Sequence, residues 1–179
     1  MVLGVNPQSV DVSMVGIVVR PWLIDDVDQL VEAYGDPQVR EWTPVSEVQD
    51  KRLSAWEFLS HADLYWCRGM PNFAIVDGLT LAGAIGFVDR RNGDELEIAF
   101  WLVESARRKG IATNVIAAVC HWAEMEIGAT TINADIIVGN WRSKRCLLRC
   151  GFALVDTLVV RPTGFEDRRS VWRMRLELS

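Results

Sequence analysis

The chain has 179 residues, half of them hydrophobic and about a quarter charged, with a net charge of −5. This composition supports a sizeable core in one domain and excludes extensive disorder, while the acidic balance argues against nucleic acid as a partner. The N-terminus lacks a secretory signal, and no stretch approaches the roughly 18 apolar residues of a membrane helix. We therefore expect a soluble, cytoplasmic protein that does not act at a membrane.

The first part of the chain is expected to be mainly helical. Residues 1–16 are interpreted as an N-terminal arm, and residues 17–179 as a single domain. In chain order, the hydrophobic spacing predicts a strand at 17–19, a helix from Asp25 or Asp26 to Tyr34, and a helix from about Val48 to Cys67. The run Gly35-Asp36-Pro37 is expected to end the first helix.

The rest of the chain alternates between strand and helix signals. Strands are predicted at 73–76, 80–89, 96–103, 132–138, 152–160 and 172–178. A hairpin turn with the Asn-Gly signal is expected at 90–94. Helices are predicted from Asn114 to Ile127, ended by Gly128, and from Asn140 to about Cys150, ended by Gly151.

Cysteine spacing gives no metal or disulfide pattern. The four cysteines are Cys67, Cys120, Cys146 and Cys150. None forms a C-x-x-C pair, and both histidines lie far in sequence from Cys146 and Cys150, so we expect no metal site. The thiols are interpreted as reduced and mostly buried.

One basic turn stands between a predicted strand and a predicted helix. It reads Arg107-Arg108-Lys109-Gly110-Ile111-Ala112-Thr113. The first N–H groups of a helix lack intrahelical partners, and the helix dipole places positive charge there. With three cations nearby, this arrangement is suited to a phosphate or pyrophosphate. The alternative is an ordinary solvated basic turn.

A second motif follows after one predicted helix and one predicted strand. It is Asn140-Trp141-Arg142-Ser143, followed by Gly151-Phe152. Together the two motifs resemble the GNAT superfamily of acyl-CoA-dependent N-acetyltransferases, whose turn is R/Q-x-x-G-x-G/A and whose later signature is N-x-x-A/S. With the strand 97–102, the chain is similar to the branch that acetylates ribosomal proteins on an N-terminal serine or alanine.

The resemblance implies an α/β (α+β) fold with a mixed, mostly antiparallel sheet of about seven strands and about four flanking helices. The strands at 96–103 and 132–138 are expected to be central, parallel and splayed. The implied co-substrate is acetyl-CoA, with no metal. Its pyrophosphate would bind the turn at 107–113, and its pantetheine arm the backbone of Trp101, Leu102 and Val103. Asn140 and Ser143 would hold the arm from the other side, although both could also serve only as helix caps.

The chain departs from this branch at several positions. Arg108 stands where the branch often has a glycine, and Ala99 also replaces a common glycine. Leu147 occupies the place of a tyrosine that acts as general acid in many family members. Val155 falls where the branch usually has a glutamate.

Acetyl transfer requires a neutral amine to attack a thioester. A protein α-amine has a pKa of about 7.7–8.0, against about 10.4 for lysine, so a weak or water-mediated base suffices for an N-terminal substrate. Glu97 is the candidate base, because strand alternation places it beside the expected thioester, although it could be an ordinary surface carboxylate. Ser143 is the candidate that protonates the leaving thiolate.

We therefore expect an acetyl-CoA-dependent N-acetyltransferase, monomeric or homodimeric, that acts by direct attack on a peptide N-terminus. The alternatives are the same reaction on a small-molecule amine, such as an antibiotic or polyamine, and a catalytically silent acyl-CoA-binding module. An acceptor pocket could be lined by tryptophans at positions 42, 56, 66 and 172, which could equally be core residues. The charged run at 161–169 is interpreted as a solvated hairpin or a ribosome-facing patch.

Overall fold

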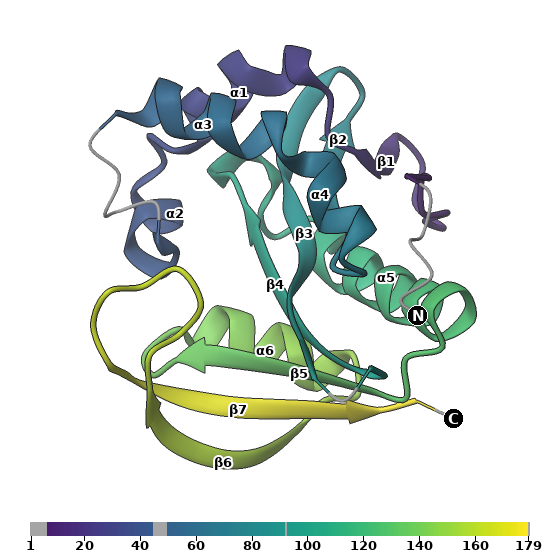
Figure 1. Cartoon of the computed structure of the whole chain (residues 1–179), viewed down its shortest axis with the longest axis vertical. Coiled ribbons are helices and arrows are strands. Elements are labelled where there is room, and N and C mark those ends of the chain that lie inside the picture. The colour runs from purple at the N-terminus through teal and green to yellow at the C-terminus, as the bar shows by residue number, and fades with distance from the viewer. Residues whose placement is uncertain (1–6, 45–49, 92, 179) are drawn as a thin grey trace.

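A seven-stranded mixed sheet crosses the computed structural model, which describes residues 7–44, 50–91 and 93–178 (Figure 1). The strands span Ile17–Pro21 (β1), Asn72–Asp77 (β2), Thr80–Arg91 (β3), Glu95–Leu102 (β4), Thr131–Ile137 (β5), Ala153–Val160 (β6) and Arg169–Glu177 (β7). Their order is β1-β2-β3-β4-β5-β7-β6, and every neighbouring pair is antiparallel except β4 with β5. The expected sheet of about seven strands with a central parallel pair is confirmed.

The described residues form six α-helices, where about four were expected. They span Val27–Ala33 (α1), Pro37–Trp42 (α2), Lys51–Ser60 (α3), Ala62–Cys67 (α4), Ile111–Ile127 (α5) and Trp141–Arg149 (α6). The helix predicted at 48–67 is interrupted at His61 and so forms both α3 and α4, while its predicted start at Val48 lies outside the described residues. Short 3-10 turns lie at Ile24–Asp26 and Glu104–Ala106. None of these helices is long and apolar enough to cross a membrane.

Helix α2 was not predicted. It begins in a run of residues that was expected only to end α1. Asp36 has an extended backbone, and its side chain accepts hydrogen bonds from the N–H groups of Gln38 at 2.8 Å and Val39 at 3.1 Å. Pro37 occupies the first helical position, where its missing N–H costs nothing. The same Asp-Pro pair therefore stops one helix and starts the next.

The helices cover both faces of the sheet, and each side has its own hydrophobic core (Figure 1). Side chains of α5 pack with Leu96 and Ile98 of β4 in the larger core. On the opposite face α1 and α3 pack over β2 and β3 in a smaller core. Because side chains alternate along a strand, Glu95 and Glu97 lie on the face opposite α5.

The N-terminal segment is attached to the sheet from residue 7 onward as far as the structure describes it. Val10 forms a β-bridge with Val19 of β1 and is buried in the larger core. Its N–H donates to the Val19 carbonyl at 2.9 Å. This segment therefore protects part of the outer edge of β1, which would otherwise expose unpaired peptide groups.

Candidate active site

The two central strands separate soon after they begin. β4 and β5 pair only from Glu95 with Thr131 to Glu97 with Asn133. Beyond this point β4 remains paired with β3, and β5 with β7, so the two halves of the sheet diverge (Figure 1). The predicted splay is confirmed, and it begins at Glu97.

Hydrogen bonding along β4 decides which peptide groups face the splay. The Val103 N–H donates to the Ala82 carbonyl of β3 at 2.9 Å. In an antiparallel ladder the peptide groups alternate in direction, so those of Trp101 and Val103 face β3, and those of Phe100 and Leu102 face β5. Of the three residues expected to meet the pantetheine arm, Leu102 alone offers its backbone to the splay, and Phe100 joins it.

The basic turn leads directly into α5. Gly110 occupies the N-cap position with φ of 80°, and no side chain caps the helix among the described residues. The helix therefore begins at Ile111, three residues before the predicted Asn114, and the N–H groups of residues 111–113 form its uncapped first turn. A Cβ at Gly110 would meet only the Asn114 side chain, at 3.7 Å, so the left-handed backbone is the reason for glycine here.

The backbone conformation of Arg108 explains why a glycine is common at this position in the family. Its φ is 64°, the only positive φ at a non-glycine position in the described part of the chain. This left-handed conformation costs other residues about 1–2 kcal/mol and costs glycine little. A glycine is therefore the residue that the backbone favours at this position, and Arg108 takes the same conformation under strain.

The three cations of the turn have different environments. Arg107 points inward, where its Nη2 donates to Asp36 at 2.7 Å and its Nε to the Leu102 carbonyl at 2.9 Å. Lys109 is half exposed, with its Nζ 3.6 Å from a carboxylate oxygen of Asp77. Arg108 is exposed. Arg107 therefore fixes the end of β4, and only Arg108 and Lys109 present their charge to solvent.

The contacts of Asp36 favour the ionised form of its carboxyl group. Burial alone would raise the pKa of Asp36. Hydrogen bonds from Arg107 and from the N–H groups of Val39 and Gln38 outweigh burial, so this pKa lies below its usual value.

The second motif lies beside the turn. The Asn140 side chain accepts a hydrogen bond from the Ser143 N–H at 3.2 Å, so the capping role proposed for Asn140 is realised. Thr113 of α5 and Cys146 of α6 bring the two helices together, with their Oγ1 and Sγ atoms 3.4 Å apart. Helices α5 and α6, which begin at the turn and at the second motif, are therefore in contact although the two motifs are distant in sequence.

Two thiols lie at this junction. Only Cys120 is buried, whereas Cys67 is exposed and Cys146 and Cys150 are partly exposed, so the expectation of mostly buried thiols is wrong. The pKa of Cys146 is lowered to about 6 by a hydrogen bond from Cys150, against the effect of burial and with help from Thr113 and Arg149. The same hydrogen bond, with burial, raises the pKa of Cys150.

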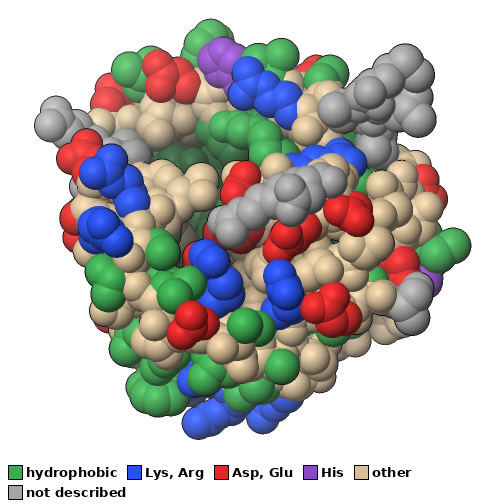
Figure 2. Space-filling model, turned by 60° about the horizontal axis from the view of Figure 1, so that its bottom comes forward, with side chains coloured by type: hydrophobic (Ala, Val, Ile, Leu, Met, Phe, Trp, Pro, Cys, Tyr) green, Lys and Arg blue, Asp and Glu red, His purple; other side chains and the backbone are tan. Residues whose placement is uncertain are grey.

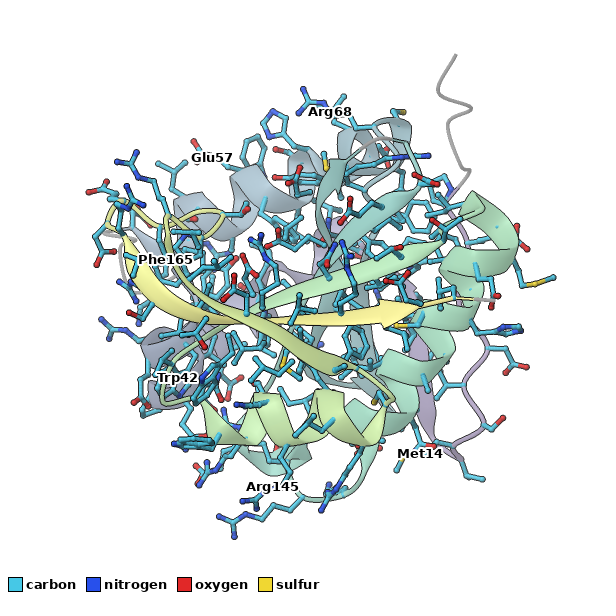
Figure 3. The ribbon with its side chains drawn as sticks, turned by 90° about the horizontal axis from the view of Figure 1, so that it is seen from below. Met14, Trp42, Glu57, Arg68, Arg145 and Phe165 are labelled. Atoms are coloured by element: carbon cyan, nitrogen blue, oxygen red, sulfur yellow. The ribbon has the colours of Figure 1, made fainter. Side chains whose placement is uncertain are left out.

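Glu97 lies in a polar cleft of about 380 Å³ on the sheet face opposite α5. The cleft is lined by Asp89, Glu97, Asp135, Val160, Arg161, Pro162, Thr163 and Arg173. Glu97 is 8% exposed. The loop that joins β6 to β7, on which Phe165 lies, forms one side of the cleft (Figure 3). Figure 2 shows that the molecule is hollowed on this side, with charged side chains around a hydrophobic floor.

The two candidate catalytic residues lie at opposite ends of the splay. Glu97 is aligned with Asn133 near the start of β5, whereas Ser143 follows the far end of that strand. The strand from Asn133 to Ile137 alone spans on the order of 13 Å. Glu97 and Ser143 therefore cannot contact each other, and a thioester in the splay would meet them from different sides.

Three residues of the site carried no signal strong enough to be predicted. Asp36 could be read only as part of a helix stop, although Asp followed by Pro is also a helix start. Asp135 and Arg173 lie at polar positions of two predicted strands, and only the strand order makes them neighbours. Among the tryptophans considered for an acceptor pocket, Trp66 and Trp172 are buried core residues. The described residues contain no group of three or more His, Cys, Asp or Glu side chains suited to a metal.

Comparison with known protein families gives one match over most of the chain. The model of an acetyltransferase (GNAT) domain matches residues 17–153. Comparison with curated protein sequences gives no match.

Solved structures share the fold at low sequence identity. MccE, a microcin self-immunity acetyltransferase in complex with acetyl-CoA and AMP, is 17% identical, with 92% of this chain and 94% of that chain covered and a TM-score of 0.80. RimL, a ribosomal alpha-N-protein acetyltransferase in complex with coenzyme A, is 16% identical, with 96% and 98% covered and a TM-score of 0.84. RimJ of Mycobacterium smegmatis, in complex with CoA-disulfide, is 20% identical, with 96% and 86% covered and a TM-score of 0.79.

Proposed function

The chain belongs to the acetyltransferase (GNAT) family and is an N-acetyltransferase, and we propose that it transfers the acetyl group of acetyl-CoA to the N-terminal α-amine of a polypeptide. The observation that carries this proposal is the position of Glu97. It is a buried carboxylate at the point where β4 and β5 separate, and it lines a polar cleft. A base at that point can reach an amine that approaches a thioester held in the splay.

The co-substrate fits the unpaired backbone groups of the site. The uncapped first turn of α5 supports binding of the pyrophosphate, and Arg108 and Lys109 add positive charge. The pantetheine arm is proposed to bond with the Phe100 peptide groups and the Leu102 N–H, which face the splay, since the Leu102 carbonyl already accepts a hydrogen bond from Arg107. Asn140 and Ser143 are proposed to contact the arm from the β5 side. Hydrogen bonds to charged groups are worth about 1.5–3 kcal/mol each, so a few of them suffice to anchor the co-substrate.

The character of the cleft supports a peptide N-terminus as acceptor. Pockets for small molecules are mostly apolar and aromatic, whereas this cleft is lined mainly by charged and polar side chains, and none of the described residues that line it is aromatic. Its carboxylates attract a cationic ammonium group. An α-amine also gives up its proton more readily than an alkylamine, so the single base Glu97 suffices.

In the proposed reaction Glu97 accepts one proton from the acceptor ammonium, directly or through water. The neutral nitrogen attacks the thioester carbonyl carbon, so a C–N bond forms and the C–S bond breaks. The Phe100 N–H stabilises the negative charge that develops on the carbonyl oxygen. The departing thiolate takes the hydroxyl proton of Ser143, which recovers a proton through water from the acylated nitrogen, because Glu97 and Ser143 lie at opposite ends of the splay. The products are the N-acetylated acceptor, coenzyme A thiol and one proton on Glu97.

The test compares acceptors at equal concentration by release of coenzyme A thiol. One set contains short peptides with a free N-terminal serine or alanine and an internal lysine, and the matched controls are the same peptides with a blocked N-terminus. Spermidine and an aminoglycoside represent small-molecule amines. We expect release only with the free N-terminal peptides, with one added acetyl group at the first residue by fragment mass spectrometry. A higher kcat/KM for either small amine would overturn the peptide assignment.

A further inference from the structure

Charged side chains cross three neighbouring strands in two successive rows beside the splay. The first row joins Glu95 of β4, Asn133 of β5 and Arg175 of β7. Arg175 Nη2 donates to Glu95 at 2.9 Å, and the Asn133 amide donates to the same carboxylate at 2.6 Å. Because β4 and β5 are still paired here, direct hydrogen bonds link the three side chains of this row.

The second row lies two residues further along β4 and β5 and two residues earlier in β7, which runs antiparallel to β5. It contains Glu97 of β4, Asp135 of β5 and Arg173 of β7, all of which line the cleft. Arg173 donates Nε and Nη2 to the two oxygens of Asp135, at 2.8 Å and 2.6 Å. The Asp135 side chain is 5% exposed and that of Arg173 is 23% exposed. Since the splay starts at this row, Glu97 faces the cleft while the guanidinium is held by Asp135.

Arg173 interacts electrostatically with the carboxylate of Glu97 as well as with its direct partner. The pKa of Arg173 is raised first by its hydrogen bond to Asp135, against the effect of burial, and further by the charges of Asp135, Glu97 and Glu95. Such an interaction is reciprocal, because a cation near a buried carboxylate favours its ionised form. The charged groups around Glu97 are Asp89 on β3, Glu95 on β4, Asp135 on β5, Arg173 and Arg175 on β7, and Arg161 in the loop between β6 and β7.

We propose that Arg173, held by Asp135, is a positioning residue that keeps Glu97 ionised in the cleft, an inference that rests on the proposed role of Glu97 as the base. Two buried carboxylates in one row, Glu97 and Asp135, repel each other, and burial favours their protonated forms. The Arg173 guanidinium, fixed by two hydrogen bonds to Asp135, opposes both effects. The pair thereby allows Glu97 to accept a proton at neutral pH.

The experiment is the pH profile of kcat/KM for Arg173→Met, Arg173→Lys and wild type, with a peptide acceptor. Removing the cation is expected to move the acid limb upward by about one pH unit, so kcat/KM falls about tenfold below the limb and little above it. Arg173→Lys keeps the charge and is expected to leave the limb near its wild-type position. The acceptor amine titrates identically in every variant, so a difference in the limb belongs to the protein.

Two further variants separate the possible outcomes. Arg175→Met removes the cation of the neighbouring row and is expected to leave the acid limb unchanged. Arg173→Met leaves Asp135 buried without its partner, so Asp135→Asn combined with Arg173→Met serves if the single variant does not fold. An unmoved limb in the folded Arg173 variants, or an equal shift in Arg175→Met, overturns the positioning role. If Glu97→Gln itself retains the acid limb, the base assignment fails instead.

Discussion

Asp36 and Arg107 are joined by a hydrogen bond of 2.7 Å between Oδ1 and Nη2, although 71 positions separate them in the sequence. The other carboxylate oxygen of Asp36 accepts the Glu104 N–H at 2.9 Å. One buried side chain thus fastens α2 to the end of β4 and to the basic turn. Arg107 therefore fixes the backbone of the basic turn, while the exposed positive charges of the turn come from the next two residues.

Replacing this carboxylate is expected to destabilise the fold. We predict that Asp36→Ala lowers the free energy of unfolding by about 2–4 kcal/mol, because a helix cap is lost and Arg107 is left without its partner. Urea unfolding at neutral pH measures the change. The matched control is Asp28→Ala, whose pair with Arg52 is largely exposed and should contribute less than about 1 kcal/mol.

The same contribution has a defined pH dependence. Because the pKa of Asp36 is lowered in the folded state, its stabilisation is present above the usual carboxyl pKa and is lost as pH falls through the folded-state pKa. The difference between wild type and Asp36→Ala should therefore shrink in acid. A difference that stayed constant down to strongly acidic pH would contradict the ion pair as its source.

The glycine at the start of α5 can be tested against the glycine at its end. We predict that Gly110→Ala weakens acetyl-CoA binding, measured by calorimetry, because an added Cβ would crowd a pyrophosphate bound at the first-turn N–H groups, as proposed. Gly128→Ala is the control, since Gly128 has a similar left-handed φ of 71° and no atom within 4 Å of an added Cβ. Both variants carry a backbone cost of about 1–2 kcal/mol, so equal affinities in the two would count against the pyrophosphate site.

Relief of backbone strain should be measurable at Arg108. We predict that Arg108→Gly raises the free energy of unfolding by about 0.5 kcal/mol, since relief of about 1–2 kcal/mol exceeds the entropic cost of about 0.5–1 kcal/mol. Thermal unfolding of the purified proteins measures this change. The same variant should bind acetyl-CoA more weakly at low salt, because one exposed cation is lost. A destabilised variant would show that other contacts of Arg108 outweigh its strain.

The role of Glu97 predicts an effect that depends on pH. Glu97→Gln should reduce turnover of a peptide acceptor more at about pH 6.5 than at about pH 9, because an α-amine loses its proton unaided above about pH 8. Steady-state assays across this range measure the ratio of variant to wild type. A ratio that does not change with pH would exclude Glu97 as the base.

Cys146 should be the thiol that reacts first at mildly acidic pH. Because its pKa is lowered to about 6, alkylation by iodoacetamide should rise as pH passes through that value and disappear in Cys146→Ser. Thr113→Val removes one of the hydrogen bonds that lower the pKa of Cys146, so alkylation of Cys146 in this variant should begin at higher pH. Cys67→Ser serves as the control and should leave this reaction in place, as followed by peptide mass spectrometry.

Local patterns in the sequence predicted most of the strands and helices. These element predictions succeeded because periodicity and turn chemistry depend only on residues close together in the chain. Gly110 among cations also indicated an anion site at a helix start, and this site stays a prediction. Errors occurred where one local signal had two meanings, as at Asp36-Pro37, which both ends α1 and begins α2.

Tertiary structure alone decided the environment of the proposed base. Asp135 and Arg173 are 38 positions apart, and their pairing depends on the order and register of β5 and β7. The point at which β4 and β5 separate is decided in the same way. Glu95 lies where the strands are still paired and its carboxylate is hydrogen-bonded, whereas Glu97 lies at the last paired position and lines the cleft. Strand order and register arise from the packing of the whole sheet, so no window of sequence contains them. The sequence therefore indicated the candidate residues, and the fold decided which of them face one another.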